Sequence, residues 1–72
     1  MKKVIEKLRQ NLEAVQAKIS DRESYYNDRS SKWKDSETAT AYEEKTDQLF
    51  ECQGLLAMAI VELRDYIDSK TP

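Results

Sequence analysis

The side chains best suited to chemistry lie together in one short segment, residues 25–34. Two tyrosines, a tryptophan and three cations gather there: Tyr25, Tyr26, Arg29, Lys32, Trp33 and Lys34. Aromatic faces can stack on a nucleobase while cations hold phosphate oxygens. Trp, Tyr and Arg are also enriched in protein-binding hot spots. In a third interpretation, Trp33 folds back to close the end of a helical bundle. We take these six residues as the candidate partner-binding site.

The groups that most often carry catalysis are scarce. The chain has no histidine to act as a base near neutral pH, and no Gly-rich loop to hold a phosphate. Its single cysteine, Cys52, falls on an apolar helix face, where we expect a buried and inert thiol. One thiol among carboxylates is not a zinc site. The sequence therefore predicts no enzymatic activity, no metal and no cofactor.

Two heptad patterns predict the elements that position these residues. In the first half, apolar residues recur at steps of three and four, which predicts a helix over about 3–28: Ile5, Leu8, Leu12, Val15 and Ile19. Whether this helix continues through Ser20 and Asp21 is left open, because Ser20 and Glu23 could form a capping box. In the second half the pattern runs longer and predicts a helix over about 36–68: Ala39, Tyr42, Thr46, Leu49, Gln53, Leu56, Ile60, Leu63 and Ile67.

The connection between the two helices, residues 29–35, is short, so the second helix must run antiparallel to the first. Asp35 or Ser36 is suited to cap the second helix, with Glu37 in its first turn. Residues 1–34 carry nine Lys or Arg and five Asp or Glu, whereas residues 35–72 carry three and nine. A basic helix beside an acidic one suits this arrangement.

Folding the chain about residues 31–33 predicts which seam residues face each other: Ile19 and Thr46, Leu8 and Leu56, and Ile5 and Ile60. Arg22 then falls beside Tyr42, close enough for a cation–π contact. Leu63 and Ile67 would extend past the start of the first helix, so their apolar side chains would need cover from another subunit.

The second helix is apolar over more than half of its circumference between Leu49 and Leu63. Further apolar residues flank its seam on both sides: Phe50, Ala57 and Val61 on one, and Cys52, Leu55, Ala59 and Tyr66 on the other. A helix with so wide an apolar face must touch at least two neighbours. A single domain of 72 residues also rarely builds a sufficient core alone.

These observations predict an all-α fold in which residues 1–72 form one antiparallel, coiled-coil-like hairpin. We expect this hairpin to self-associate as a four-helix bundle or a larger helical oligomer, with a homodimer favoured. The residues predicted to hold the oligomer are those on the apolar half of the second helix: Leu49, Phe50, Leu56, Ile60, Leu63 and Ile67.

Residues 25–37 and 41–46, YYNDRSSKWKDSE and AYEEKT, resemble small uncharacterised helical-hairpin proteins of bacteriophages and bacteria. The shared pattern is an aromatic, an Arg-Ser pair, a Lys-Trp pair and a Ser-Glu pair ahead of a Tyr and a Lys-Thr. The resemblance implies a helical hairpin and an origin in a phage or mobile element. It implies no activity, so no functional residue is carried over from it.

Our leading hypothesis is a non-enzymatic protein–protein interaction module, such as a phage or mobile-element accessory factor that binds and modulates a host protein. One alternative is a module that binds a nucleotide or small anion at the Trp33 segment, and another is a structural assembly subunit. Broad affinity for nucleic acid is not expected, because the second half of the chain is acidic. No segment has the apolar length of a membrane span, and residues 1–9 do not form a signal peptide. We therefore expect a cytoplasmic protein, in the host cytoplasm if phage-encoded.

Overall fold

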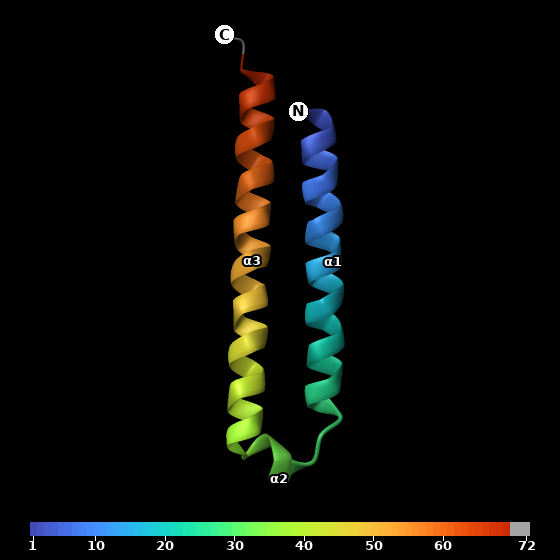
Figure 1. Cartoon of the computed structure of the whole chain (residues 1–72), viewed down its shortest axis with the longest axis vertical. Helices are drawn as coiled ribbons and strands as arrows, with labels where there is room; N and C mark the ends of the chain where they lie inside the picture. The colour runs from blue at the N-terminus through green and yellow to red at the C-terminus, as the bar shows by residue number, and fades with distance from the viewer. Residues whose placement is uncertain (70–72) are drawn as a thin grey trace.

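The computed structural model describes residues 1–69 and contains three helices and no strand in that range. Helix α1 spans Lys2–Asn27, the short helix α2 spans Ser31–Lys34, and α3 spans Glu37–Asp68. Helices α1 and α3 lie side by side and antiparallel, and α2 forms the tip that joins them (Figure 1). The molecule is a rod with principal extents of 58 × 16 × 11 Å. The predicted all-α hairpin is confirmed.

Both long helices follow from local sequence preferences. Helix α1 contains no glycine or proline and is continuous through Ser20 and Asp21, so the capping box considered at Ser20 is not used. At the start of α3, the Ser36 side chain accepts a hydrogen bond from the Ala39 backbone N–H at 3.2 Å. Glu37 lies in the first turn, where its charge favours the helix dipole. Of the two predicted caps, Ser36 is the one used.

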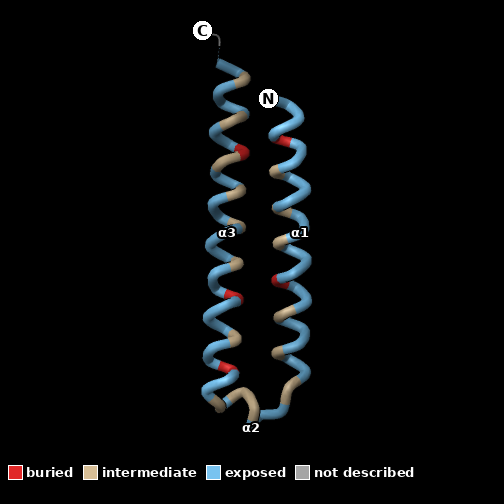
Figure 2. Tube along the Cα trace, viewed as in Figure 1, coloured by how far each residue is buried: buried red, intermediate tan, exposed pale blue. Residues whose placement is uncertain are grey.

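The core is a narrow line of side chains along the contact between α1 and α3. Its buried members are the following five residues: Ile5, Ile19, Ala39, Thr46 and Ile60. Figure 2 shows them on the facing sides of the two helices, with exposed residues covering the rest. The other positions of both predicted heptads are half-buried. Hydrophobic periodicity therefore identified the seam correctly on both helices.

Near the tip, Arg22 lies beside Tyr42, as the predicted register requires. The long Arg22 side chain also reaches Thr46, one turn further along α3, and donates a hydrogen bond to its hydroxyl. The end of α3 does project past the start of α1 (Figure 1), but Leu63 and Ile67 do not lack intramolecular cover. Leu63 lines a hollow with Met1, Ile67 lines one with Ile5, and both are half-buried.

Candidate functional site

The tip of the hairpin is ordered by two serine caps. Ser30 has an extended backbone (φ −66°, ψ 158°), and its hydroxyl accepts a hydrogen bond from the Trp33 N–H at 3.2 Å. Ser36 caps α3 in the same way and also donates its hydroxyl hydrogen to the Trp33 carbonyl. Trp33 is thus held between two capped helix starts. The two serines thus build a compact helical tip.

Four aromatic rings pack against one another where the tip meets the long helices. We call Tyr25, Tyr26, Trp33 and Tyr42 the tip aromatic cluster. The Trp33 ring makes edge-to-face contacts with all three tyrosines, at centroid distances of 6.0 Å to Tyr25, 5.6 Å to Tyr26 and 5.8 Å to Tyr42. Tyr25 and Tyr42 stack at 5.2 Å. These geometries are the favourable ones for aromatic pairs, so the cluster joins all three helices.

Three cations lie over the rings of this cluster. The guanidinium of Arg22 is 3.9 Å from the centroid of Tyr42, as the sequence predicted, and that of Arg29 is 4.2 Å from Tyr25. The Lys34 ammonium lies 5.7 Å from Tyr26 and donates a hydrogen bond to the Asn27 carbonyl at 3.4 Å. Arg29 and Lys34 of the tip are therefore engaged with the hairpin itself.

The six residues predicted to bind a partner at the tip divide into two groups. Tyr26, Arg29, Trp33 and Lys34 are half-buried, whereas Tyr25 and Lys32 are exposed. The structure brings five of the six together in the packing of the tip, and Lys32 is the exception. This is the arrangement in which Trp33 folds back to close the end of the bundle. Sequence reasoning placed Tyr42 beside Arg22 but missed its part in the aromatic cluster.

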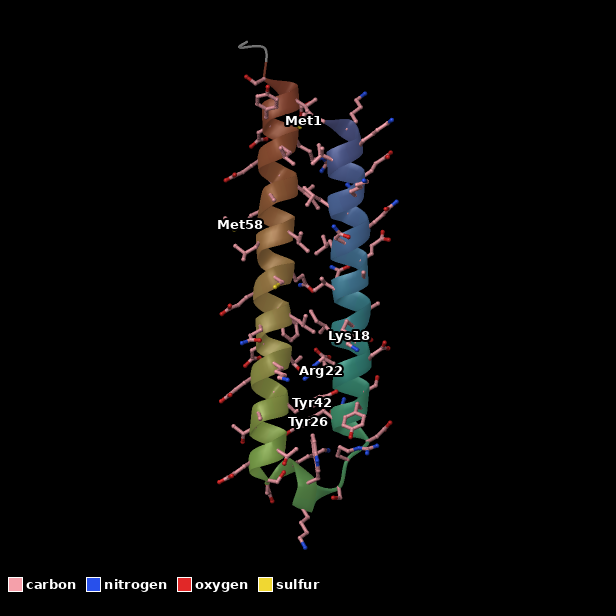
Figure 3. The ribbon with its side chains drawn as sticks, viewed as in Figure 1. Met1, Lys18, Arg22, Tyr26, Tyr42 and Met58 are labelled. Atoms are coloured by element: carbon pink, nitrogen blue, oxygen red, sulfur yellow. The ribbon has the colours of Figure 1, made fainter. Side chains whose placement is uncertain are left out.

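Arg22 occupies a seam position and is held by a small polar network. Its Nε donates to the Thr46 hydroxyl at 2.9 Å, and its Nη2 donates to the Tyr42 carbonyl at 2.9 Å. The Thr46 hydroxyl in turn donates to the same carbonyl at 3.1 Å. The buried hydroxyl of Thr46 is thereby satisfied, and α1 is fixed against α3 at one register. Figure 3 shows Arg22 and Tyr42 on the facing sides of the helices near the tip.

A hollow of about 220 Å³ lies beside this network, lined in part by Arg22, Tyr26 and the carboxylates Glu23 and Glu43. A hydrogen bond to Glu43, followed by desolvation and the negative charges of Glu43 and Asp35, raises the pKa of the Tyr26 hydroxyl above its ordinary value. Carboxylates next to the only nearby guanidinium oppose the binding of an anion. This hollow is poorly suited to a phosphate.

The largest exposed apolar side chains are on α3, away from α1. Leu55 is 66% exposed, Met58 61% and Val61 55%, while Phe50 is 44% exposed. Figure 3 shows Met58 on the side of α3 that faces away from α1. No charged residue occurs between Cys52 and Val61, although 36% of the chain is charged. The middle of α3 is thus uncharged on every face, including those that meet solvent.

The apolar residues beside the seam form two faces, one on each side of it, and all of them except the half-buried Ala59 are exposed. Residues three or four apart lie on the same side of a helix. By this spacing, the first face consists of Phe50, Gly54, Ala57, Met58 and Val61, and we call it the Gly54 face. The second, or Leu55 face, consists of Cys52, Leu55, Ala59 and Tyr66. A shallow hollow of about 290 Å³ lies on the Gly54 face, lined in part by Ala57, Met58 and Val61.

The residues predicted to hold an oligomer mostly belong to the hairpin itself. Ile60 is buried against α1, and four others are half-buried in the seam: Leu49, Leu56, Leu63 and Ile67. Only Phe50 of the six is exposed. The prediction assigned these seam residues to the oligomer because the sequence pattern shows only that α3 has a wide apolar face. It does not show which part of that face packs against α1 and which part is left for another subunit. Met58, which is 61% exposed, was not recognised.

Cys52 corrects a second prediction. It was expected to be buried and inert, but the thiol is exposed on the Leu55 face. The expectation placed the residue correctly beside the seam. It was wrong about burial because α1 covers the seam alone, so flanking positions are left open to solvent.

A third hollow, about 360 Å³, lies at the end of the hairpin opposite the tip. Its charged lining mixes both signs: Lys2, Arg9 and Arg64 with Glu6 and Asp68. Within residues 1–69, no group of three or more His, Cys, Asp or Glu side chains could hold a metal ion. Among the same residues, no helix combines the length and apolar character that crossing a membrane requires.

No protein-family model matches this chain, and no curated protein or solved structure is significantly similar to it. The resemblance of residues 25–46 to small phage and bacterial hairpin proteins therefore stays a prediction. The structure itself therefore provides the two candidate sites, which are the packed tip and the exposed apolar faces of α3.

Proposed function

We propose that this chain is a non-enzymatic protein–protein interaction module that binds a helix of another chain through the exposed faces of α3. The observation that carries the proposal is the uncharged stretch from Cys52 to Val61, in which Leu55, Met58 and Val61 are all more than half exposed. Contiguous exposed apolar surface on a highly charged protein is typical of an interaction site. Apolar side chains at helical spacing suit a helical partner in particular.

This proposal moves the binding surface from the tip to α3. Trp33 is half-buried among three tyrosines, and the cations beside it lie over tyrosine rings or bond to the backbone. Binding a partner with these groups would first require breaking their internal contacts. The α3 faces need no such rearrangement, because their side chains are already in solvent.

Affinity capture from a cell extract tests the proposal. Wild-type bait is compared with Met58→Lys/Val61→Lys, which places two charges on α3, and with Lys32→Glu, which changes the exposed charge of the tip. We expect capture to be lost in the first variant and kept in the second. If the wild-type chain binds neither another protein nor itself, the proposal is wrong. If Lys32→Glu abolishes capture while the α3 variant retains it, the tip is the binding site.

The predicted nucleotide or anion alternative is less well supported. Stacking on a base requires a free aromatic face, and the Trp33 ring contacts Tyr25, Tyr26 and Tyr42. Titration of the Trp33 fluorescence with nucleotides distinguishes this alternative directly. Quenching that saturates below millimolar concentration would favour nucleotide binding over protein binding.

The resemblance to phage and bacterial hairpin proteins adds the proposal that the partner is a host protein.

A further inference from the structure

The chain exposes far more surface than a globular protein of its mass. Its accessible surface is 5920 Å², whereas a compact monomer of 8.4 kDa has about 4600 Å². The excess is about 1300 Å², and a standard protein–protein interface buries about 800 Å² on each partner. A two-helix rod with one line of buried side chains therefore has enough surplus surface for one complete interface.

Gly54 lies at the centre of the Gly54 face and near the middle of α3. Glycine destabilises a helix interior relative to alanine, so a glycine here calls for a structural reason. The hairpin supplies none, because a Cβ added at Gly54 would meet nothing within 4 Å. A glycine without neighbours on an exposed apolar face suits the close approach of a second helix from outside.

The Gly54 face is self-complementary about this glycine. Two antiparallel copies of α3 that cross at Gly54 bring together residues equally far before and after it. The bulky Phe50 then meets Met58 and the small Ala57 of the other copy. Near the two ends of the contact, Arg64 lies opposite Glu44 of the other copy, and Glu43 lies opposite Asp65. One surface thus supplies both halves of a closed two-fold interface.

Charge selects the antiparallel orientation. Helix α3 carries eight acidic and two basic residues. In a parallel pair each acidic residue would face its own copy, and Arg64 would face Arg64. The antiparallel arrangement instead places Arg64 opposite Glu44, Asp47 opposite Val61 and Glu51 opposite Ala57. Glu43 and Asp65 are the like charges that still face each other near its ends, and the arrangement also opposes the two helix dipoles.

From these observations we infer that the partner of the Gly54 face is a second copy of this chain, with the two α3 helices antiparallel and crossing at Gly54. The inference rests on the proposed function and names its partner. In this dimer the two α3 helices lie at the centre with one α1 outside each, and the two tips are at opposite ends. Cys52, on the Leu55 face, stays outside this interface.

Light scattering after size exclusion tests the association. We expect twice 8.4 kDa for the wild type and for Tyr66→Lys, which charges the Leu55 face. Gly54→Leu should have a mass of 8.4 kDa with unchanged helicity, because leucine has room in the hairpin but blocks the crossing. Since leucine adds apolar surface, a Gly54→Leu chain that dimerises as well as the wild type would overturn the inferred crossing.

Cysteine cross-linking tests the orientation, using the Cys52→Ser background. Gly54→Cys should oxidise rapidly to a covalent dimer, because a residue at an antiparallel crossing meets its own copy. Val61→Cys should not, because Val61 lies opposite Asp47 of the other copy. Efficient cross-linking at both positions would indicate parallel helices, and at neither would exclude the crossing. Either result overturns the inference.

Failure of the inference and failure of the proposed function have different signatures. A folded wild-type monomer that still captures another protein, dependent on Met58 and Val61, rejects the second copy as partner and retains the binding function. A folded monomer that captures nothing rejects both. A dimer that persists in Gly54→Leu and is lost in Tyr66→Lys moves self-association to the Leu55 face and rejects the inferred interface.

Discussion

Replacing Trp33 with alanine should destabilise the hairpin, because its ring contacts all three tyrosines of the tip aromatic cluster. Each aromatic pair contributes about 0.5–1.5 kcal/mol beyond burial, and the three pairs share one ring and are not additive. Full truncation of a buried tryptophan costs about 3–5 kcal/mol. Trp33 is half-buried, so we expect a loss of about 2 kcal/mol.

A loss of this size is a large fraction of the total. A chain of this length has an unfolding free energy of roughly 4–11 kcal/mol. One kcal/mol shifts the Tm of a small domain by about 4–8 °C, so Trp33→Ala should lower the Tm by about 8–16 °C. Circular dichroism during thermal and urea unfolding measures both quantities. All variants must be compared at one protein concentration, because self-association stabilises the folded state.

Lys32→Ala is the matched control for Trp33→Ala. Lys32 is the neighbouring residue in α2, and its side chain is exposed, so its removal should change stability by less than about 0.5 kcal/mol. If Trp33→Ala were as mild as Lys32→Ala, the ring would not be closing the end of the hairpin. Trp33 would then be free to bind a partner, as the composition of the tip first suggested.

Two further predictions concern groups near the tip. Arg22→Ala and Thr46→Ala should not be additive in urea unfolding, with a coupling of about 1 kcal/mol from their shared hydrogen bond; a coupling of zero would show that the bond is not formed in solution. The pKa of Tyr26 is raised chiefly by its hydrogen bond to Glu43, so its contribution to stability is complete below pH 10 and is lost as the pH rises through the folded-state pKa. Tyr26→Phe should therefore flatten the fall in Tm above pH 10, and an equal slope in the variant and the wild type would contradict the assignment.

The fold could be predicted from the sequence because its main determinants are periodic. Ile5 and Ile19 in α1, and Thr46 and Ile60 in α3, lie on heptad positions and are buried. The same pattern placed Arg22 in the seam next to Tyr42, where the cation–π contact is found. Helix periodicity fixes which face of a helix is buried, and in an antiparallel hairpin that is most of the fold.

The tip conformation and the exposed surfaces could not be predicted in the same way. Ser30 and Ser36 each cap a helix at the tip, and the helix between them is too short to leave a periodic signal in the sequence. Which apolar residues stay exposed depends on how much of α3 a single α1 can cover. Ile60 and Val61 are adjacent and similarly apolar, yet Ile60 is 6% exposed and Val61 55%. Only the packed hairpin separates them.

The tip cluster shows why residue type alone leaves the role of the tip open. Arg, Trp and Tyr favour both binding surfaces and internal packing, since a large ring and a guanidinium can contact either an intramolecular neighbour or a partner. Sequence alone does not show which neighbour is present. In the hairpin, Tyr42 of α3 supplies an intramolecular neighbour for the Trp33 ring.

The hairpin begins at Met1 and returns to Ser69 at the same end, with α2 at the opposite end of the 58 Å rod (Figure 1). Neighbouring termini are the geometry that allows a domain to be inserted into a loop of another protein. Grafted in this way, the chain would act as a stiff arm that carries its tip away from the host surface. A fluorescent protein joined at either terminus would likewise lie far from the aromatic cluster and leave Trp33 undisturbed as a local probe.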